Sequence, residues 1–190
     1  VQQQAGLKRF EIALKPELLD RLQIGASVAT NGVCLTVTKI SNDKVFFDVM
    51  EETLSLTNLD NVQQGDQVNI ERSLTFGSEI GGHILSGHIH TQATIVSISD
   101  TPEHYDIELA VDAKWKDYIF YKGFVAVNGC SLTVGQLTDR GFKLHLIPET
   151  LRLTNLGLQA VGDTMNIEID SQTQVIVDTV ERIMARKQLG

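Results

Sequence analysis

The heptapeptide Asn31–Val37, which reads Asn-Gly-Val-Cys-Leu-Thr-Val, decides the fold because it occurs twice. It returns 97 positions later as Asn128–Val134, which reads Asn-Gly-Cys-Ser-Leu-Thr-Val. Glu52–Leu59 returns at the same offset as Glu149–Leu156. Between residues 31–71 and 128–168, 17 of 41 aligned positions are identical, where about two or three matches are expected by chance. The chain is therefore an internal duplication.

The duplication extends towards the N-terminus at a different offset. Val1–Ala5 is similar to Ile89–Ala93, 88 positions later, so the first unit is shorter here than the offset of 97 requires. Ser86–His88 should then have a counterpart before Val1. We expect residues before Val1 and a loop near Gly6 to be absent from this sequence. The alternative is that the first unit is truly shorter, since termini and loop tips vary most.

Each unit contains short β-branched segments bounded by turn residues, with Asn31-Gly32 among them. Several closely spaced strands in fewer than 100 residues favour two antiparallel barrels over a parallel sheet with crossover helices. Short helical turns are predicted within Leu18–Leu22 and Ala113–Tyr121. The predicted strands are Ala29–Ile40, Lys44–Met50 and Asp66–Arg72, repeated as Gly123–Gln136, Gly141–Ile147 and Asp163–Ile169.

The C-terminal segment has a helical pattern and lies outside both repeats. Asp170 or Ser171 is a plausible helix cap, and an apolar stripe at helical spacing follows. The stripe predicts packing on a barrel or on the same helix of another subunit. With Phe76–Gly87 as the connector, we expect a first barrel in residues 1–82, a second in 83–170 and a helix in 171–190. The stripe consists of Val175, Ile176, Val180, Ile183 and Met184.

Composition narrows the function. The 190 residues include 16 basic and 24 acidic side chains, for a net charge of −8, which argues against binding to nucleic acid or to an anionic membrane. Two cysteines, Cys34 and Cys130, cannot build a disulfide framework or a cysteine-based zinc site, and they favour a reducing compartment. No apolar run approaches the ~20 residues that span a bilayer. We expect a soluble cytoplasmic protein with a small neutral or mildly anionic ligand.

Alternation along the repeated strand predicts a row of polar side chains. Cys34 and Thr36 should share one face, while the residues between them fill the barrel. Ser131 and Thr133 occupy the matching positions of the second unit. One interpretation is a solvated strand face. The recurrence of further polar residues at matching places, such as Thr53 and Thr150, favours a pair of binding sites instead.

Three histidines, His83, His88 and His90, lie in one short stretch and suggest a metal site. We predict none, because no carboxylate or cysteine completes a regular ligand pattern. His88 is a candidate proton carrier, since imidazole titrates near neutral pH. The alternative is a structural histidine. For Lys122 and Asp170 the plain interpretations are a surface cation and a helix cap.

Together with Ser86–Ile89, Tyr121–Phe124, Leu146–Thr150 and Asp170–Gln174, the two copies of the heptapeptide resemble the riboflavin synthase family, alpha chain, over essentially the whole sequence. The resemblance implies two Greek-key β-barrels and a C-terminal helix that gathers a homotrimer. It implies the dismutation of two molecules of 6,7-dimethyl-8-ribityllumazine to riboflavin and 5-amino-6-ribitylaminouracil by four-carbon transfer, with no cofactor. Lumazine synthase is a further partner to test.

The same resemblance assigns site residues and places the working site between the first barrel of one subunit and the second barrel of another. Ser131, Thr133, His88 and Cys34 are the catalytic candidates, with Asp170 as support. Lys122 should contact the neighbouring ligand. Asn128 departs from an aspartate of some members, so it is a turn residue or hydrogen-bond partner. The expected first-barrel pocket comprises Val1, Cys34, Leu35, Thr36, Asp48, Val49, Met50, Glu51, Glu52 and Thr53; the second comprises Gly87, His88, Ile89, Ser131, Leu132, Thr133, Ile147, Pro148, Glu149, Thr150, Leu151 and Arg152.

Three other functions compete with this one. A non-enzymatic lumazine-binding or flavin-binding antenna protein would share the duplicated fold, but degraded motifs in one half are typical of it, and both halves here keep theirs. A flavin-dependent reductase would need a nicotinamide site, and the chain contains no GxGxxG. A purely structural trimer would leave the repeated pocket pattern unexplained.

Overall fold

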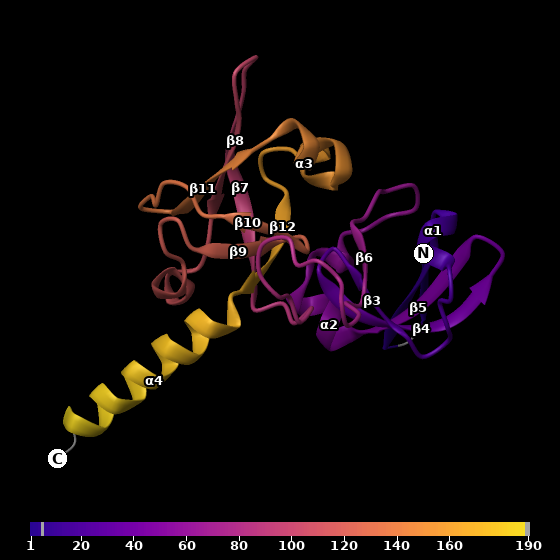
Figure 1. Ribbon diagram of the computed structural model, residues 1–190, viewed down its shortest axis with the longest axis horizontal. Coiled ribbons are helices and arrows are strands. Elements are labelled where there is room, and N and C mark those ends of the chain that lie inside the picture. The colour runs from indigo at the N-terminus through magenta and orange to yellow at the C-terminus, as the bar shows by residue number, and fades with distance from the viewer. Residues whose placement is uncertain (5, 189–190) are drawn as a thin grey trace.

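The computed structural model describes residues 1–4 and 6–188 of the chain. It contains two six-stranded antiparallel sheets and a long helix that projects away from the second of them (Figure 1). The predicted all-β class, with two related barrels in tandem and a C-terminal helix, is confirmed. Ala5, which ends the stretch similar to Ile89–Ala93, lies outside the described residues.

The first unit follows the predicted strand pattern with two changes. The strand predicted over Asp66–Arg72 is shorter and begins at Ile70; in the turn before it, the Asp66 carboxylate accepts the N–H of Gln63 at 2.8 Å. A short helix that the sequence did not predict follows the strand ending at Met50. The elements are β1 (Gln2–Gln4), β2 (Leu7–Ala13), α1 (Pro16–Leu19), β3 (Ser27–Thr30), β4 (Val33–Ser41), β5 (Lys44–Met50), α2 (Glu51–Leu56), η1 (Asn58–Asp60) and β6 (Ile70–Arg72).

The second unit repeats these elements, and many of them start 97 residues later. Its helix α3, for example, begins at Pro148, where α2 begins at Glu51. Residue Ile147, predicted as the end of a strand, instead precedes α3 as its N-cap. The elements are β7 (Thr91–Asp100), β8 (Tyr105–Ala110), η2 (Ala113–Tyr118), β9 (Phe124–Val127), β10 (Cys130–Thr133), β11 (Gly141–Leu146), α3 (Pro148–Leu153), η3 (Asn155–Leu158) and β12 (Thr164–Ile169).

The duplicated Asn-Gly pair makes a tight turn between two paired strands. Asn31 and Gly32 have φ values of 45° and 80°, in the left-handed region that asparagine and glycine tolerate best. The turn therefore splits the single strand predicted over Ala29–Ile40 into β3 and β4, which pair as a hairpin. The strand predicted over Gly123–Gln136 is split in the same way into β9 and β10.

Both sheets follow one cyclic strand order. The first runs β1-β2-β5-β4-β3-β6, and the second runs β10-β9-β12-β7-β8-β11. If each strand of the second sheet is replaced by its equivalent in the first, the two orders become the same closed ring, opened at different points. This is the arrangement of a Greek-key barrel, in which strands distant in sequence close a sheet on itself.

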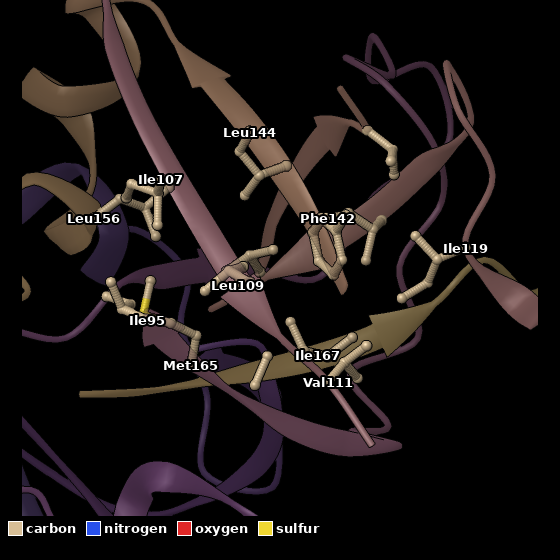
Figure 2. Close-up of a cluster of buried hydrophobic side chains, with 14 of the residues drawn as sticks. Ile95, Ile107, Leu109, Val111, Ile119, Phe142, Leu144, Leu156, Met165 and Ile167 are labelled. Carbon is tan, nitrogen blue, oxygen red and sulfur yellow. The ribbon is translucent and has the colours of Figure 1, made fainter. Parts of the chain in front are cut away.

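Each barrel encloses its own apolar core. Figure 2 shows the larger core, in which Ile107, Leu109, Phe142 and Ile167 converge from different strands of the second barrel. Burial of one such side chain contributes about 1.5–3 kcal/mol. The first core is built around fully buried residues that alternate along β2, β4 and β5 with outward-facing ones; it includes Phe10, Val28, Leu35, Val37, Val45, Phe47, Val49, Leu54 and Leu59.

Six asparagines join the barrels in a network in which five are buried and Asn69 is half-buried. They form three pairs at the offset of 97: Asn31 with Asn128, Asn58 with Asn155, and Asn69 with Asn166. The network is two-fold related. The Asn58 N–H donates to Asn166 Oδ1 at 2.7 Å, and the equivalent Asn155 N–H donates to Asn69 Oδ1 at 2.7 Å. Buried polar groups are costly unless they are paired, so this network fixes one relative placement of the barrels.

Helix α4 (Ser171–Gln188) begins where Asp170 caps it. The Asp170 carboxylate accepts the N–H of Thr173 at 3.0 Å and its hydroxyl at 2.8 Å, which confirms the predicted cap. The helix touches the second barrel through Tyr118, whose hydroxyl donates to Asp178 at 2.6 Å; this bond raises the pKa of Tyr118 to about 12. No helix in the described part of the chain is long and apolar enough to cross a bilayer.

Candidate functional site

The polar row predicted on the first barrel is present on β4. Cys34 and Thr36 are exposed. The residues that alternate with them, Val33, Leu35 and Val37, are buried in the core. The Leu35 side chain therefore cannot contact a ligand on the outer face. On the second barrel, Ser131 is half-buried and Thr133 is exposed, so the equivalent row is also present on β10.

The connector between the barrels lies directly over Ser131. His83 donates its backbone N–H to Ser131 Oγ at 3.1 Å, and its ring Nδ1 lies 2.6 Å from the same oxygen. The ring is also stacked on Phe124, with centroids 5.3 Å apart and an interplanar angle of 19°. Burial lowers the pKa of His83, opposed by the negative charges of Asp170 and Glu168. A neutral imidazole is thus held against the second-barrel row.

The same connector then crosses to the first barrel. The Gly87 carbonyl accepts the N–H of Cys34 at 2.9 Å, and Ile89 packs against the first-barrel core. A Cβ on Gly87 would lie 2.6 Å from Cys34 Cβ, so only glycine allows this approach. The expected assignment of Gly87 and Ile89 to the second-barrel pocket is therefore wrong. The chain passes over β4 before it enters β7 at Thr91.

Two equivalent glutamates flank the connector, and they differ in burial and in hydrogen bonding. Glu168 is 4% exposed, and its carboxylate accepts from the N–H and hydroxyl of Ser86 at 2.6 and 2.8 Å and from the N–H of Gly87 at 3.1 Å. Glu71 is its counterpart at the offset of 97. Partial burial, and next the charge of Glu168, raise the pKa of Glu71. The second-barrel carboxylate anchors the connector to the junction of the barrels.

A cavity at this junction brings the two rows together. It is lined by both units and by the connector, and one residue of each row, Cys34 and Ser131, faces it. Other residues of its wall are Glu71, His83, Gly32 and Gly129. A Cβ on Gly32 would lie 2.6 Å from the backbone N of Gly129, so the two turn glycines are in contact there. The cavity thus lies where the duplicated strands approach each other.

The first predicted binding run begins on β5 and the second begins at the N-cap of α3, and both end in a short helix. In the first run, Val49 is buried in the core, whereas Met50, Glu51 and Glu52 are exposed and Thr53 is half-buried. Asp48, at its start, is held by two hydrogen bonds from Arg9 at 2.6 and 2.9 Å, and the bond from Arg9 lowers the pKa of Asp48.

In the second run, Ile147, Pro148 and Glu149 are exposed, Thr150 is half-buried, and Leu151 packs partly against the core. Arg152 pairs with Glu149, its Nε donating to the carboxylate at 2.8 Å. Leu132, which lies between Ser131 and Thr133 on β10, is half-buried against the same core.

The remaining predicted residues lie apart from one another. His88 is exposed, and its N–H donates to Ser86 Oγ at 3.3 Å. His90 Nδ1 accepts the N–H of Ile169 at 3.2 Å, so the three neighbouring histidines point to three different places. Lys122 is exposed in a left-handed turn with φ 64°, and Val1 is exposed beside β1.

Sequence reasoning did not single out His83, Glu168 or the asparagine network. A signal existed for the network, since three asparagines keep their identity in both repeats, where a solvated loop residue would be free to vary. For His83, the preceding pair Gly81-Gly82 indicates a backbone that can approach other chain segments closely. Nothing in the local pattern of Glu168 distinguishes it from an outward-facing strand residue.

The chain is similar to proteins of known activity over nearly all its length. The family model described as "Lumazine binding domain" matches residues 1–73 and 86–170. A riboflavin synthase of Escherichia coli (strain K12) is 47% identical over 189 residues, 99% of this chain and 89% of that protein. A riboflavin synthase of Chlamydia pneumoniae is 44% identical over 180 residues, 95% of this chain and 86% of that protein.

Two solved structures have the same fold. LumP complexed with riboflavin superposes with a TM-score of 0.79 at 27% identity, covering 86% of this chain and 88% of that chain. LumP complexed with 6,7-dimethyl-8-(1'-D-ribityl) lumazine superposes with a TM-score of 0.77 at 25% identity, covering 85% and 87%.

Proposed function

The chain belongs to the lumazine-binding family, and on that premise we propose how its two units perform the riboflavin synthase reaction. In that reaction, two molecules of 6,7-dimethyl-8-ribityllumazine give riboflavin and 5-amino-6-ribitylaminouracil by transfer of a four-carbon unit. Donor and acceptor are the same compound. A protein that carries two related sites is therefore suited to hold one molecule at each.

The observation that carries the proposal is the equivalence of the two polar rows. Cys34 with Thr36, and Ser131 with Thr133, stand at positions related by the duplication and point outward from their barrels. Each row can present hydrogen-bonding groups to the ring of a bound lumazine. Holding two rings at reacting distance can lower the barrier by up to about 7–11 kcal/mol in favourable intramolecular cases.

The structure supports a division of the site residues by barrel. In the first site we place Cys34 and Thr36, the exposed start of α2 at Met50–Thr53, and Gly87–Ile89 of the connector, since Gly87 lies on Cys34. In the second we place Ser131, Thr133 and the start of α3 at Ile147–Arg152.

Ser131, Thr133, Cys34 and His88 are the proposed catalytic groups. Each can donate or accept a hydrogen bond as charge develops on the ring. Asp170 supports the site indirectly, by capping α4, and Lys122 is exposed and free to reach a neighbouring ligand.

The reaction requires both sites to face each other, and we propose that a homotrimer provides this. Within one chain, the asparagine network holds the barrels in one placement, and the connector lies on Ser131 and on Cys34 in the cavity that both rows line. We therefore place the facing partner of each site on another subunit. Helix α4 carries an apolar stripe with Val175 and Ile176 exposed by 66% and 63%, as expected of a helix that packs on its own copies. The first barrel of one subunit would then meet the second barrel of the next. Association with lumazine synthase stays a prediction.

A direct test uses the purified chain and the lumazine alone. We expect riboflavin fluorescence to appear without added metal or nucleotide, with one riboflavin formed for two lumazines consumed. A pure binding protein would instead retain the lumazine unchanged, and that outcome would refute the enzyme. Deletion of residues 173–190 should dissociate the oligomer and abolish turnover together; a fully active monomer would refute the shared site.

A further inference from the structure

The connector segment Gly81–His83 makes an unusually close contact with Ser131. Gly82 has φ 94°, and a Cβ at this position would collide with Ser131 Oγ. The next residue directs both its backbone N–H and its ring at that same oxygen, at 3.1 and 2.6 Å. The hydroxyl is therefore held by one residue from two sides.

The imidazole of His83 is fixed by packing as well as by hydrogen bonding. It stacks on Phe124 at 5.3 Å between centroids. Its Nε2 atom is buried and has no hydrogen-bond partner within residues 1–4 and 6–188. Ser131 is thus the side chain to which the ring is bonded in this part of the chain, and no competing partner turns the ring away.

We propose that His83 is a positioning residue for Ser131, which sets whether the hydroxyl accepts or donates a hydrogen bond towards the substrate. With a neutral ring that carries its proton on Nε2, the Ser131 O–H donates to Nδ1, and Oγ also accepts the His83 backbone N–H. One lone pair of Oγ is then left for the substrate. With a protonated ring, Nδ1–H donates to Oγ, and the hydroxyl hydrogen must turn elsewhere. The inference rests on the proposed function, which assigns Ser131 to the substrate-facing row.

The charges around the ring determine which state prevails. Burial disfavours the protonated ring, while Asp170 and Glu168 favour it. The Glu168 charge is already engaged by Ser86 and Gly87, which weakens its pull on the imidazole. Glu71, Glu79 and Arg72 line the same cavity. On balance, the neutral ring and the accepting hydroxyl are favoured at neutral pH.

The first barrel has no counterpart of this device. Cys34, the equivalent of Ser131, has its backbone N–H bonded to the Gly87 carbonyl, and no side chain of the connector is bonded to its thiol within the described residues. If His83 positions Ser131, then the serine of the second site depends on the protonation state of a histidine bonded to it, whereas the cysteine of the first site does not. The two lumazines would therefore be bound in chemically different ways.

Two variants separate positioning from folding. His83→Phe keeps an aromatic ring against Phe124 but removes the nitrogen that faces Ser131. His83→Asn offers an amide oxygen near the place of Nδ1 and cannot titrate. We expect His83→Phe to lower kcat about tenfold with KM changed less than about twofold, and His83→Asn to recover most of the loss. The inflection that His83 contributes to the acid limb of the kcat profile, between about pH 5 and about pH 8, should be absent in His83→Asn, whereas any inflection due to His88 remains.

The inference is overturned if His83→Phe retains the wild-type kcat, or if the acid limb of His83→Asn is the same as that of the wild type. Nitrogen NMR of the ligand-free protein provides a readout that needs no turnover. The neutral His83 ring should carry its proton on Nε2, and a ring protonated on Nδ1 alone would contradict the proposed hydrogen bond. Wild-type protein that makes no riboflavin would refute the proposed function, whereas the NMR result would still decide the role of His83. Thermal unfolding of both variants shows whether either has lost the fold.

Discussion

The two barrels are most alike where they touch each other, whereas single groups that face the cavity beside this contact differ between them. The asparagines that join them are identical in both repeats, and so are the turn glycines that meet between them. Yet Cys34 stands where the second barrel has Ser131, and the glutamate pair differs in its hydrogen bonding. The duplication has thus preserved the interface that orients the two sites and let the sites themselves diverge.

The divergence extends to a charge reversal near the binding runs. Arg9 on β2 pairs with Asp48 on β5 in the first barrel. At the equivalent places of the second barrel, Asp106 on β8 faces His145 on β11, with Nδ1 and Oδ1 2.7 Å apart. The acidic and basic partners have exchanged strands, and the base of the second barrel carries charge only when it is protonated. The four predictions below test how far this asymmetry extends.

The largest expected effect concerns the shared interface. Asn166→Ala removes the acceptor of the Asn58 N–H and the donor to the Asn31 carbonyl, at a site with no solvent exposure. We expect a loss of about 3 kcal/mol in the free energy of unfolding. Asn69→Ala, its counterpart, should cost less because Asn69 is only half-buried and water can replace its partners.

Urea unfolding measures both losses, with the exposed Asn61→Ala as a control that should change stability by less than about 0.5 kcal/mol. Equal losses at Asn166 and Asn61 would show that the network does not hold the barrels together.

The next effect compares the two rows. Ser131→Ala should lower kcat about a hundredfold if its hydroxyl takes part in proton movement. Cys34→Ala should have a smaller effect, because the thiol is a weak hydrogen-bonding group. Steady-state kinetics measure the loss of kcat in both variants. The same measurement on Cys34→Ser tests a protein in which both rows carry the same residues. The comparison fails if the cysteine and serine variants lose the same activity.

A third prediction contrasts the two connector glycines. Both have positive φ values, 78° at Gly87 and 94° at Gly82, so alanine is strained equally at each. A Cβ on Gly87 meets the backbone of β4, with Cys34 N 2.9 Å away, which cannot yield. A Cβ on Gly82 meets Ser131 Oγ, which can rotate away, and Ser131 Cβ at 2.8 Å, from which the exposed connector at Gly82 can shift.

We therefore expect Gly87→Ala to lower stability by about 1–2 kcal/mol more than Gly82→Ala in thermal unfolding, and Gly82→Ala to impair mainly turnover. The reverse ranking in stability would mean that the connector does not rest on β4 as the structure shows.

Much of this architecture could be predicted from the sequence. The repeat fixed the number of units, and the alternation Cys34, Leu35, Thr36 gave the exposed and buried faces of β4 correctly, because in-and-out alternation is a local property of a strand. The cap at Asp170 was equally local. The helices α2 and α3 were missed because each has only six residues, and such short segments show no clear periodicity.

The path of the connector could not be predicted. Gly87 and Ile89 adjoin the second barrel in sequence, and they were assigned to it, but they pack on the first. Their place depends on the Glu168 carboxylate, which is contributed from 81 residues away along the chain. Long-range polar contacts of this kind leave no local pattern, and the role of His83 was hidden for the same reason.

The smallest predicted effect arises from the charge-reversed pair. The pKa of Asp48 is lowered chiefly by its hydrogen bond from Arg9. A carboxyl with a lowered pKa in the folded state stabilises the fold above its unfolded value of about 3.9, and this contribution is lost as the pH falls through the folded pKa. At about pH 6, Asp48→Asn should therefore lower Tm by about 1 °C, since the pair is partly exposed. As the pH falls below about 3.9 and through the lowered folded pKa of Asp48, the difference from wild type should shrink towards zero, because the Asp48 carboxyl becomes protonated. Asp20→Asn, on a carboxylate side chain that is 77% exposed, is the matched control and should leave Tm unchanged over the same pH range. A difference at Asp48 that persists undiminished in acid would mean that the pair stabilises the first barrel by hydrogen-bond geometry and not by charge. In that case the exchange of acid and base between the barrels would have no electrostatic consequence.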